Sequence, residues 1–215
     1  MSGTGHDLEA LLEAGCRALG VPVDREVRER LLAYTEEVLR WGRRINLTGV
    51  TRAEDFITGH VLDAVAVLPH LGINPGDAWA DVGTGAGLPG IPLALLTPES
   101  QWTLVEPRAK RWTFLVHAAH HLGLANVQVL RARIEDAEVP PESLDGVVSR
   151  ALGPPALAVH PWLRPGGRIA LLAGPDHARW HDPARGLPLT PLAPTRIHIP
   201  GVSGERWLVW FEKSG

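Results

Sequence analysis

The chain has 215 residues, 45% of them hydrophobic, and a net charge of −3, which suits one globular domain with a modest extension and not a protein that holds nucleic acid by overall basic charge. Proline or glycine interrupts its longest apolar runs, none of which approaches the ~20 residues that span a bilayer, and residues 1–5 lack the pattern of a signal peptide, so we expect a cytoplasmic protein. One cysteine, Cys16, excludes an internal disulfide and a multi-cysteine zinc site.

Residues 1–72 are predicted to be helical. Asp7 can cap a first helix whose apolar residues share one face, namely Leu8, Leu11, Leu12, Cys16 and Leu19. Asp24 can cap a longer helix, and the apolar stripe of that helix recurs at steps of four and three: Val27, Leu31, Tyr34, Val38, Trp41 and Ile45. Thr51, with Glu54 three residues later, fits a capping box that opens a third helix through about residue 68.

After a turn-rich joint at residues 71–77, short apolar strands alternate with helices. The expected strands are 78–82, 101–106, 127–130, 146–149 and 169–172, and the expected helices are 90–96, 109–122 and 156–163. Residues 175–194 indicate a long loop, and residues 196–199 and 207–211 indicate an antiparallel pair at one edge of the sheet. This alternation predicts an α/β fold, a Rossmann-like, mainly parallel sheet with helices on both faces, over residues 73–215, with residues 1–72 as an N-terminal helical extension.

The sharpest functional signal is the segment Asp81-Val82-Gly83-Thr84-Gly85-Ala86-Gly87-Leu88-Pro89-Gly90, where a strand passes into a helix. Glycines there permit a tight turn and let a ligand approach the backbone. The spacing Asp-x-Gly-x-Gly-x-Gly is a common form for S-adenosylmethionine, whereas nicotinamide fingerprints run Gly-x-Gly-x-x-Gly. Glu106 ends the next predicted strand about 20 residues on, where a carboxylate can bind ribose hydroxyls. The alternatives are a turn without a ligand and, for Glu106, an ion-paired surface glutamate.

Two absences narrow the chemistry. The fourth strand is followed by Ser149-Arg150-Ala151 and not by Asn-Pro-Pro-Tyr or Asp-Pro-Pro-Tyr, which argues against methylation of an exocyclic amine by that route. Cys16 lies in the first predicted helix, far from the carboxyl ends of the strands, which argues against a covalent cysteine mechanism. The remaining simple case is a nucleophile with a free lone pair, such as guanine N7, which needs alignment and no general base.

Motifs along most of the chain match a known family. They are Trp41 with Asn46-Leu47-Thr48, His60-x-Leu62-Asp63, the glycine segment continued by Ile91-Pro92, Lys110-Arg111 with Phe114-Leu115, Arg133-Ile134-Glu135, Val148-Ser149-Arg150-Ala151, Leu163-x-Pro165-Gly166-Gly167 and Gly204-Glu205-Arg206. On these residues the chain resembles the bacterial RsmG (GidB) family, the guanine-N7 methyltransferases of 16S ribosomal RNA. The resemblance implies a class I methyltransferase fold, S-adenosyl-L-methionine as the cofactor, and 16S rRNA, free or within the 30S subunit, as the substrate.

The resemblance also implies roles for individual residues. The methionine and adenosine site would be lined by Asp81, Gly83, Gly85, Gly87 and Leu88, with Glu106 on the ribose and Ile134 and Glu135 flanking the adenine. Arg150 would lie beside the cofactor where the guanine enters, as the candidate catalytic residue, and an arginine at the carboxyl end of a strand can bind phosphate or base. The alternative for Arg150 is an ion pair with a carboxylate at the edge of the core. His60 and Asp63, three apart on one helix face, either pair and buttress the cleft or cap the core.

Several basic clusters are candidates for contact with RNA. The set is Arg43, Arg44, Lys110, Arg111, Arg133 and Arg206, with Arg40, Arg108 and Arg131 beside them, and each cluster is alternatively a solvated face. Three positions depart from the family pattern: Gly59 replaces an Arg, Ala64 a Ser and Ala173 a Lys. Because of these departures, the target could instead be a different RNA, a protein or a small molecule. A second alternative is a ribosome-binding relative that transfers no methyl group. We expect a monomer that binds no metal and no membrane.

Overall fold

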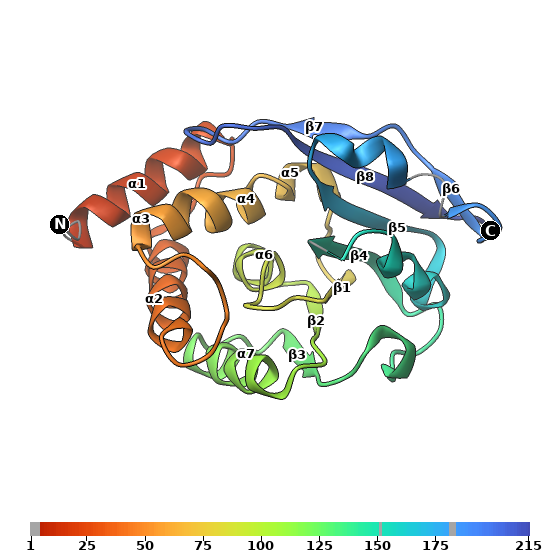
Figure 1. The fold of residues 1–215 in the computed structure, drawn as a ribbon, viewed down its shortest axis with the longest axis horizontal. Coiled ribbons are helices and arrows are strands. Elements are labelled where there is room, and N and C mark those ends of the chain that lie inside the picture. Colours follow the sequence, from red (N-terminus) through yellow and green to blue (C-terminus); the bar gives the residue numbers. More distant parts are fainter. Residues whose placement is uncertain (1–4, 151, 181–183) are drawn as a thin grey trace.

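An eight-stranded sheet forms the centre of the fold, and the computed structural model describes residues 5–150, 152–180 and 184–215 (Figure 1). Predictions that concern residues 1–4, Ala151 and residues 181–183 lie outside the described residues. The strand order is β3-β2-β1-β4-β5-β8-β6, and β7 also pairs with β8. Strands β1 to β5 run parallel to their neighbours, whereas β8 is antiparallel to β5, β6 and β7. The prediction of a mainly parallel, Rossmann-like sheet is confirmed.

The strands follow the sequence pattern closely in the parallel half of the sheet. Their bounds are β1 (Ala78–Val82), β2 (Gln101–Val105), β3 (Val127–Leu130), β4 (Leu144–Arg150) and β5 (Leu163–Ala173). β1 and β3 lie where they were predicted, β2 ends one residue earlier, and β4 and β5 are longer. The antiparallel half consists of β6 (Leu189–Pro191), β7 (Thr195–Ile197) and β8 (Arg206–Lys213).

The predicted antiparallel pair at residues 196–199 and 207–211 is confirmed by β7 and β8, which pair at one end of the sheet. β5 pairs along one side of β8, and β6 and β7 pair along the other. One prediction about the C-terminal part is wrong. Residues 175–194 are not one loop, because they contain the 3-10 turn η4 (Pro175–Trp180) and β6. Leu189 is buried where β6 pairs with β8, and this burial supports a strand that the surrounding prolines concealed.

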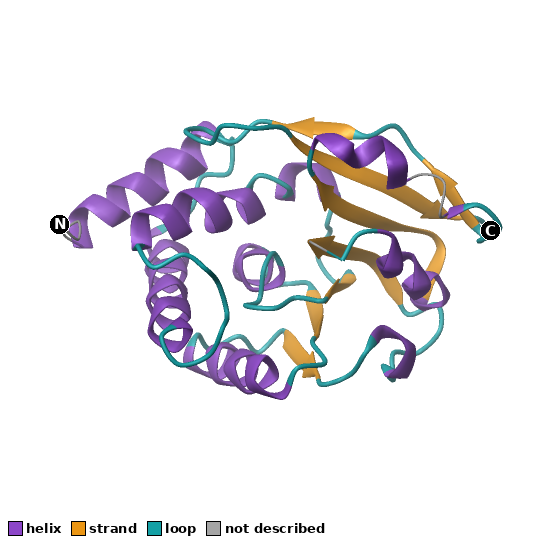
Figure 2. Ribbon diagram, in the orientation of Figure 1, coloured by secondary structure: helices purple, strands orange, loops and turns teal. Residues whose placement is uncertain are grey.

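The predicted helix at residues 156–163 is a 3-10 segment, η3 (Pro154–Trp162). The prolines of this segment, among them Pro161 in its interior, have no N–H to donate and therefore interrupt an α-helical hydrogen-bond ladder. The other helices after β1 are α6 (Gly90–Leu96) and α7 (Ala109–His121), both as predicted to within a residue, and the short 3-10 turn η2 (Ile134–Asp136). Helical segments thus lie on both sides of the strands (Figure 2).

The N-terminal helices are α1 (Gly5–Ala18), α2 (Arg25–Gly42), α3 (Ala53–Phe56), the π turn η1 (Ile57–Val61), α4 (Leu62–Val65) and α5 (Leu68–Leu71). Asp24 caps α2 as predicted, since its side chain accepts from the Val27 N–H at 2.8 Å. The Asp7 cap is wrong, because α1 already contains Asp7 in its first turn. The Thr51 capping box is also wrong, because the cap residue is Arg52, whose side chain pairs with Glu54.

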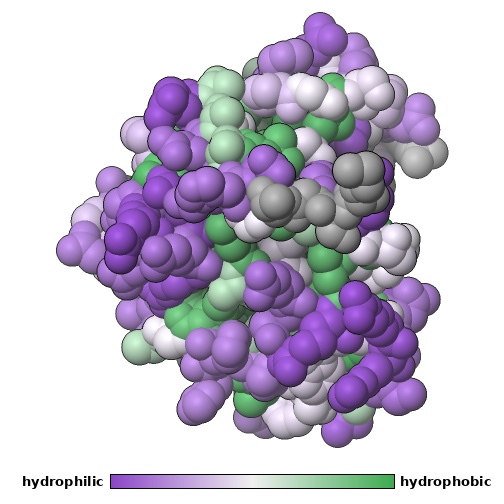
Figure 3. Space-filling view, turned by 90° about the vertical axis from the view of Figure 1, so that its left-hand side faces the viewer, coloured by the Kyte–Doolittle hydropathy of each residue, from purple (hydrophilic) through white to green (hydrophobic). Residues whose placement is uncertain are grey.

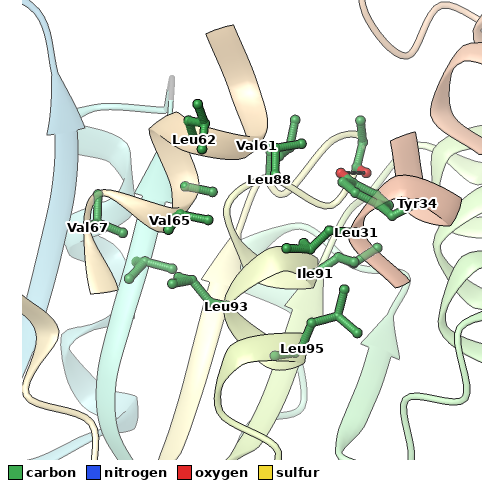
Figure 4. Packing of buried hydrophobic residues seen from close by; sticks show 14 of the residues in the cluster. Leu31, Tyr34, Val61, Leu62, Val65, Val67, Leu88, Ile91, Leu93 and Leu95 are labelled. Carbon is green, nitrogen blue, oxygen red and sulfur yellow. Dashed lines mark hydrogen bonds between the residues drawn. The ribbon is translucent and has the colours of Figure 1, made fainter. Parts of the chain in front are cut away.

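The core has two parts, one on each face of the sheet, because successive strand residues point to opposite faces. Along β8, Leu208 and Trp210 join the first part, and Val209 and Phe211 join the second. The second part packs under η3. The first part joins α1, α2 and η1–α4 to α6 and α7, and Figure 4 shows the close packing of its side chains from α2, α4 and α6. The helices between residues 5 and 71, in the segment predicted as an N-terminal helical extension, therefore share a core with the sheet. In the described ranges no helix has the length and apolar character needed to cross a membrane.

Gly146 on β4 lies in close contact with Trp79 of β1, and a Cβ at Gly146 would be 2.4 Å from the indole ring. Because Trp79 is buried, Gly146→Ala is expected to lower the free energy of unfolding by about 1–3 kcal/mol, measured by urea denaturation. The matched control is Gly59→Ala, where the new Cβ meets nothing within 4 Å in a helical turn, so its stability should be unchanged or raised by up to about 1 kcal/mol. Equal destabilisation of the two variants would contradict the close contact.

Candidate active site

The glycine segment forms a turn of bare backbone between β1 and α6. The N–H groups of Gly83 and Thr84 donate to the carbonyl of Val105 at the end of β2. Gly83, Gly85 and Gly87 all have positive φ, the region that only glycine adopts readily. A Cβ would also lie 2.4 Å from Leu152 at Gly83 and 2.4 Å from Ile91 at Gly87. The backbone conformation therefore favours glycine at both positions, and at Gly87 the packing of buried Ile91 also requires it.

Asp81 lies beneath this turn and holds its two ends together. Its Oδ2 accepts from the Thr84 hydroxyl at 2.5 Å and from the Gly90 N–H at 2.8 Å. The side chain is fully buried, and its Oδ1 has no hydrogen-bond partner among the described residues. Burial raises the pKa of Asp81 to about 6, although the two hydrogen bonds oppose the rise. The observed contacts of Asp81 are with the loop, and a direct contact with a cofactor stays a prediction.

Glu106 is buried directly after β2, so the alternative of an ion-paired surface glutamate is wrong. Its Oε2 accepts from the Gly85 N–H at 3.0 Å and its Oε1 accepts from the Arg108 N–H at 2.9 Å. The carboxylate thus joins the end of β2 to the glycine turn. A ribose diol at this place would compete with the Gly85 N–H for Oε2, and the ribose role of Glu106 stays a prediction.

A cavity of about 270 Å³ opens in front of the turn. Its walls come from the turn, from the N-terminal segment, from α7 and from β4; the lining residues are Leu47, Thr48, His60, Gly83, Thr84, Gly85, Ala86, Leu88, Arg111 and Arg150. A Cβ at Gly85 would have Arg111 as its nearest neighbour at 3.6 Å, so the backbone is approachable there. Exposed glycine backbone at the carboxyl ends of parallel strands fits the adenosine and methionine parts of S-adenosylmethionine.

Arg150, at the carboxyl end of β4, lines this cavity and is also held by an ion pair. Its Nη1 lies 3.2 Å from Oδ2 of Asp63 and donates to Nδ1 of His60 at 3.2 Å. Asp63 also pairs through Oδ1 with Nε of Arg206 at 3.2 Å. Arg150 therefore lines the cavity and also pairs with a carboxylate at the core edge, while its place beside the cofactor stays a prediction. Of the two interpretations of His60 and Asp63, buttressing the cleft is the one that these contacts support.

His60 is held in its neutral form. Burial and then the Arg150 guanidinium lower its pKa, because both disfavour the imidazolium. Since Nδ1 accepts from Arg150, the ring proton is assigned to Nε2, which lies 3.5 Å from the Thr48 hydroxyl. The imidazole edge in the cavity is therefore uncharged, and the arginines supply the positive charge.

Tyr34 is a site residue that the sequence did not indicate. It is fully buried on α2, and its hydroxyl donates to the carbonyl of Ala86 in the glycine turn at 2.8 Å. Burial raises its pKa well above the ordinary value. In the sequence Tyr34 lies on the apolar stripe of the second helix, so it was interpreted as a core residue. The one available signal was its hydroxyl, which needs a partner when buried. Leu47 and Thr48, which the sequence analysis named only as part of a family motif, also line the cavity.

A groove with basic walls adjoins the cavity. It consists of two hollows of about 540 and 410 Å³ that share Arg44 and Ile45, and Arg111 belongs to both the first hollow and the cavity. We call it the basic groove; its residues are Arg40, Trp41, Arg44, Ile45, Asn46, Arg108, Ala109, Lys110, Arg111 and His117. Figure 3 shows that hydrophilic side chains cover most of the molecular face that carries the N-terminal helices.

The structure brings together some of the predicted RNA-binding residues and not others. Arg44, Lys110 and Arg111 line the basic groove, and Arg43 is exposed at the end of α2 beside it. Arg206 lies away from the groove, on Asp63. Arg133 is exposed before η2 and lines neither hollow.

The two residues assigned to the adenine lie just beyond β3, at the sheet edge that also carries the glycine turn. Ile134 is half-buried against the second part of the core, and Glu135 is exposed. Neither lines the cavity. Their contact with an adenine stays a prediction, and it requires the ligand to extend from the glycine turn across the end of β2 toward β3.

The family model and two similar curated proteins agree on one family. Residues 27–180 match the family described as rRNA small subunit methyltransferase G (GidB). Ribosomal RNA small subunit methyltransferase G of Ectopseudomonas mendocina is 40% identical over 151 residues, which cover 70% of this chain and 69% of that protein. The protein of the same description from Methylobacillus flagellatus is 36% identical over 210 residues, which cover 94% and 97%. A SAM-dependent methyltransferase from Aquifex aeolicus has a similar fold, with a TM-score of 0.60, 16% identity and coverage of 74% and 93%.

Tyr34→Phe is expected to raise the Kd for S-adenosylmethionine by about tenfold, measured by calorimetric titration. Without the hydroxyl, the buried Ala86 carbonyl loses its donor, which costs about 1–3 kcal/mol unless the glycine turn moves. Thr97→Val is the matched control, because its hydroxyl accepts from Trp102 away from the cavity; this variant should lose stability and keep its affinity. An unchanged Kd in Tyr34→Phe would show that the hydroxyl serves folding alone.

Proposed function

Because the chain belongs to the rRNA small subunit methyltransferase G (GidB) family, we propose that it transfers a methyl group from S-adenosylmethionine to N7 of a guanine in 16S rRNA of the small ribosomal subunit. The observation that carries the proposal is one cavity that combines a glycine turn, Glu106 beside it and a positively charged Arg150 at the next strand end. S-adenosylmethionine, when bound, supplies an electrophilic methyl group. The fold and the dependence on this cofactor follow from the family.

The residues of the cavity suit a nucleophile that needs no deprotonation. Guanine N7 carries a free lone pair, so the site must orient the base and exclude water. Arginine commonly binds guanine through O6 and N7 together, but a fork on both atoms would block the nucleophile. We therefore assign to Arg150 the guanine O6 or an adjacent phosphate, which leaves N7 free to face the methyl group.

The basic groove supports an RNA substrate despite the acidic balance of the whole chain. Arg44, Arg108 and Lys110 are exposed along it, and Arg111 leads into the cavity. In the family pattern, positively charged residues occupy the positions of Gly59 and Ala173. This chain lacks those two charges, but the groove supplies other positive charges near the site. The guanidinium group of arginine can bind a phosphate through two N–H donors. Such contacts along the groove would lead a strand of rRNA toward the cavity.

Mapping of 7-methylguanosine in 16S rRNA tests the function directly. A strain without the gene should lack one 7-methylguanosine, and the cloned gene should restore it while an Arg150→Ala variant should not. Purified protein with labelled S-adenosylmethionine should label free 16S rRNA, 30S subunits or both, and the preferred form identifies the natural substrate. Retention of all 7-methylguanosine in the deletion strain would reject the target, and labelling of another RNA, a protein or a small molecule would replace it.

The basic groove should make binding dependent on salt. Each phosphate contact that is removed is expected to lower the slope of log K against log salt by about 1. The double variant Arg44→Gln, Lys110→Gln should therefore bind rRNA more weakly and with a smaller slope, measured by filter binding at several salt concentrations. Arg168→Gln is the control, because Arg168 pairs with Glu212 on the exposed face of β5. If the double variant keeps the slope of the wild type, the RNA follows another surface.

A further inference from the structure

Asp63 joins three elements that are far apart in the chain. It lies on α4 in the N-terminal helical layer, and it pairs with Arg150 on β4 and with Arg206 at the start of β8. These partners are 87 and 143 positions away in the sequence. Its two carboxylate oxygens are divided between them, each at 3.2 Å. One side chain therefore sets the distance between the helical layer and two strands of the sheet.

The charges in this cluster do not cancel. Asp63 supplies one negative charge, Arg150 and Arg206 supply two positive charges, and His60 is neutral because its Nδ1 accepts from Arg150. The cluster thus keeps a net positive charge at the edge of the cavity. Only 9% of the Asp63 side chain is exposed, whereas 25% of Arg150 and 38% of Arg206 are exposed. The carboxylate is inside, and the two guanidinium groups extend from it toward solvent.

Such an arrangement is a costly way to stabilise a fold. The free-energy cost of removing two charges from water offsets most of the electrostatic attraction in a buried ion pair. Well-packed apolar residues in place of the pair often stabilise a fold at least as much. A buried carboxylate that holds two half-exposed arginines does what apolar packing cannot, because it fixes the direction of the remaining N–H donors. Asp63 does not line the cavity, so any effect on the reaction passes through the arginines.

We propose that Asp63 is a positioning residue for methyl transfer, which aims Arg150 into the cavity and ties it to Arg206 so that both arginines bind the same rRNA segment. The inference rests on the proposed function and names the residue that organises its site. In this arrangement Arg150 contacts the target nucleotide, and Arg206 binds a neighbouring phosphate. The arginines need no new ordering when RNA arrives, because Asp63 already holds them.

The first test is the kinetics of Asp63→Asn on the rRNA substrate that the wild type methylates. This variant keeps the shape and removes the charge. We expect kcat to fall by about 10²-fold, the Kd for S-adenosylmethionine to stay within about twofold of the wild type, and Asp63→Glu to recover part of the rate. The matched control is Glu9→Gln, which breaks the Glu9–Arg28 pair between α1 and α2 away from the cavity and should leave kcat unchanged.

The second test uses the titration of His60, which reports the loss of the Asp63 charge beside the cavity. The charged groups that face His60 are Asp63 on α4, Arg150 on β4 and Arg206 on β8, and Asp63 is the one that raises its pKa. Asp63→Asn should therefore lower the pKa of His60 further below its usual value, as followed by NMR with a His60→Gln sample for assignment. If activity requires neutral His60, the acid limb of the rate profile shifts to lower pH in the same variant.

The third test asks whether Asp63 acts through Arg206 as well as Arg150. Arg206→Gln alone should lower kcat, and Asp63→Asn should cost clearly less in the Arg206→Gln background than in the wild type, because residues of one network are not additive. If Asp63→Asn does not fold, Asp63→Glu and Arg206→Gln decide the matter by the same readouts. Normal kcat in the folded variants, or full additivity, would overturn the inference while leaving the methyltransferase assignment intact. Absence of rRNA methylation by the wild type would instead reject the proposed function.

Discussion

The site depends on one constraint, which is that a turn built around three glycines has few side chains with which to hold its own shape. Four contacts from outside hold it: the Val105 carbonyl at the end of β2, the carboxylates of Asp81 and Glu106, and the hydroxyl of Tyr34. They come from β1, from the end of β2 and from α2. The N-terminal helices are therefore part of the ligand site, since α2 supplies the last of these contacts from the shared core.

The parallel half of the sheet could be predicted from the sequence because short apolar runs between glycines and prolines leave few alternatives. The same reasoning failed where proline changes the backbone chemistry, as in η3, where an apolar run with Pro161 inside forms 3-10 turns. It also failed for β6, a strand of three residues that is defined by its pairing with β8 and by little in its own composition. Local capping patterns were right for Asp24 and wrong for Thr51, because a cap depends on where the helix begins and neighbouring charges such as Arg52 compete for the same place.

The parts of the site that could be predicted are those encoded by a local motif. The glycine turn and Glu106 follow from spacing along adjacent strands, and Arg150 followed from its strand end and from the family resemblance. The contacts of Tyr34 with Ala86 and of Asp63 with Arg206 join residues 52 and 143 positions apart, and no local pattern reveals such pairs. His60 and Asp63 were recognised as neighbours on a helix, but their common partner on β4 emerges only when the helical layer packs on the sheet.

The position of β8 inside the sheet ties the Asp63–Arg206 pair to the pairing of β8 with β5. β8 pairs with β5 from Arg168 to Ala173, and it brings Arg206 to Asp63. A nascent chain therefore has the glycine turn and Arg150 before it has the second arginine. A product of premature termination before β8 would leave the apolar edge of β5 uncovered, as a template for aggregation and a substrate for proteases.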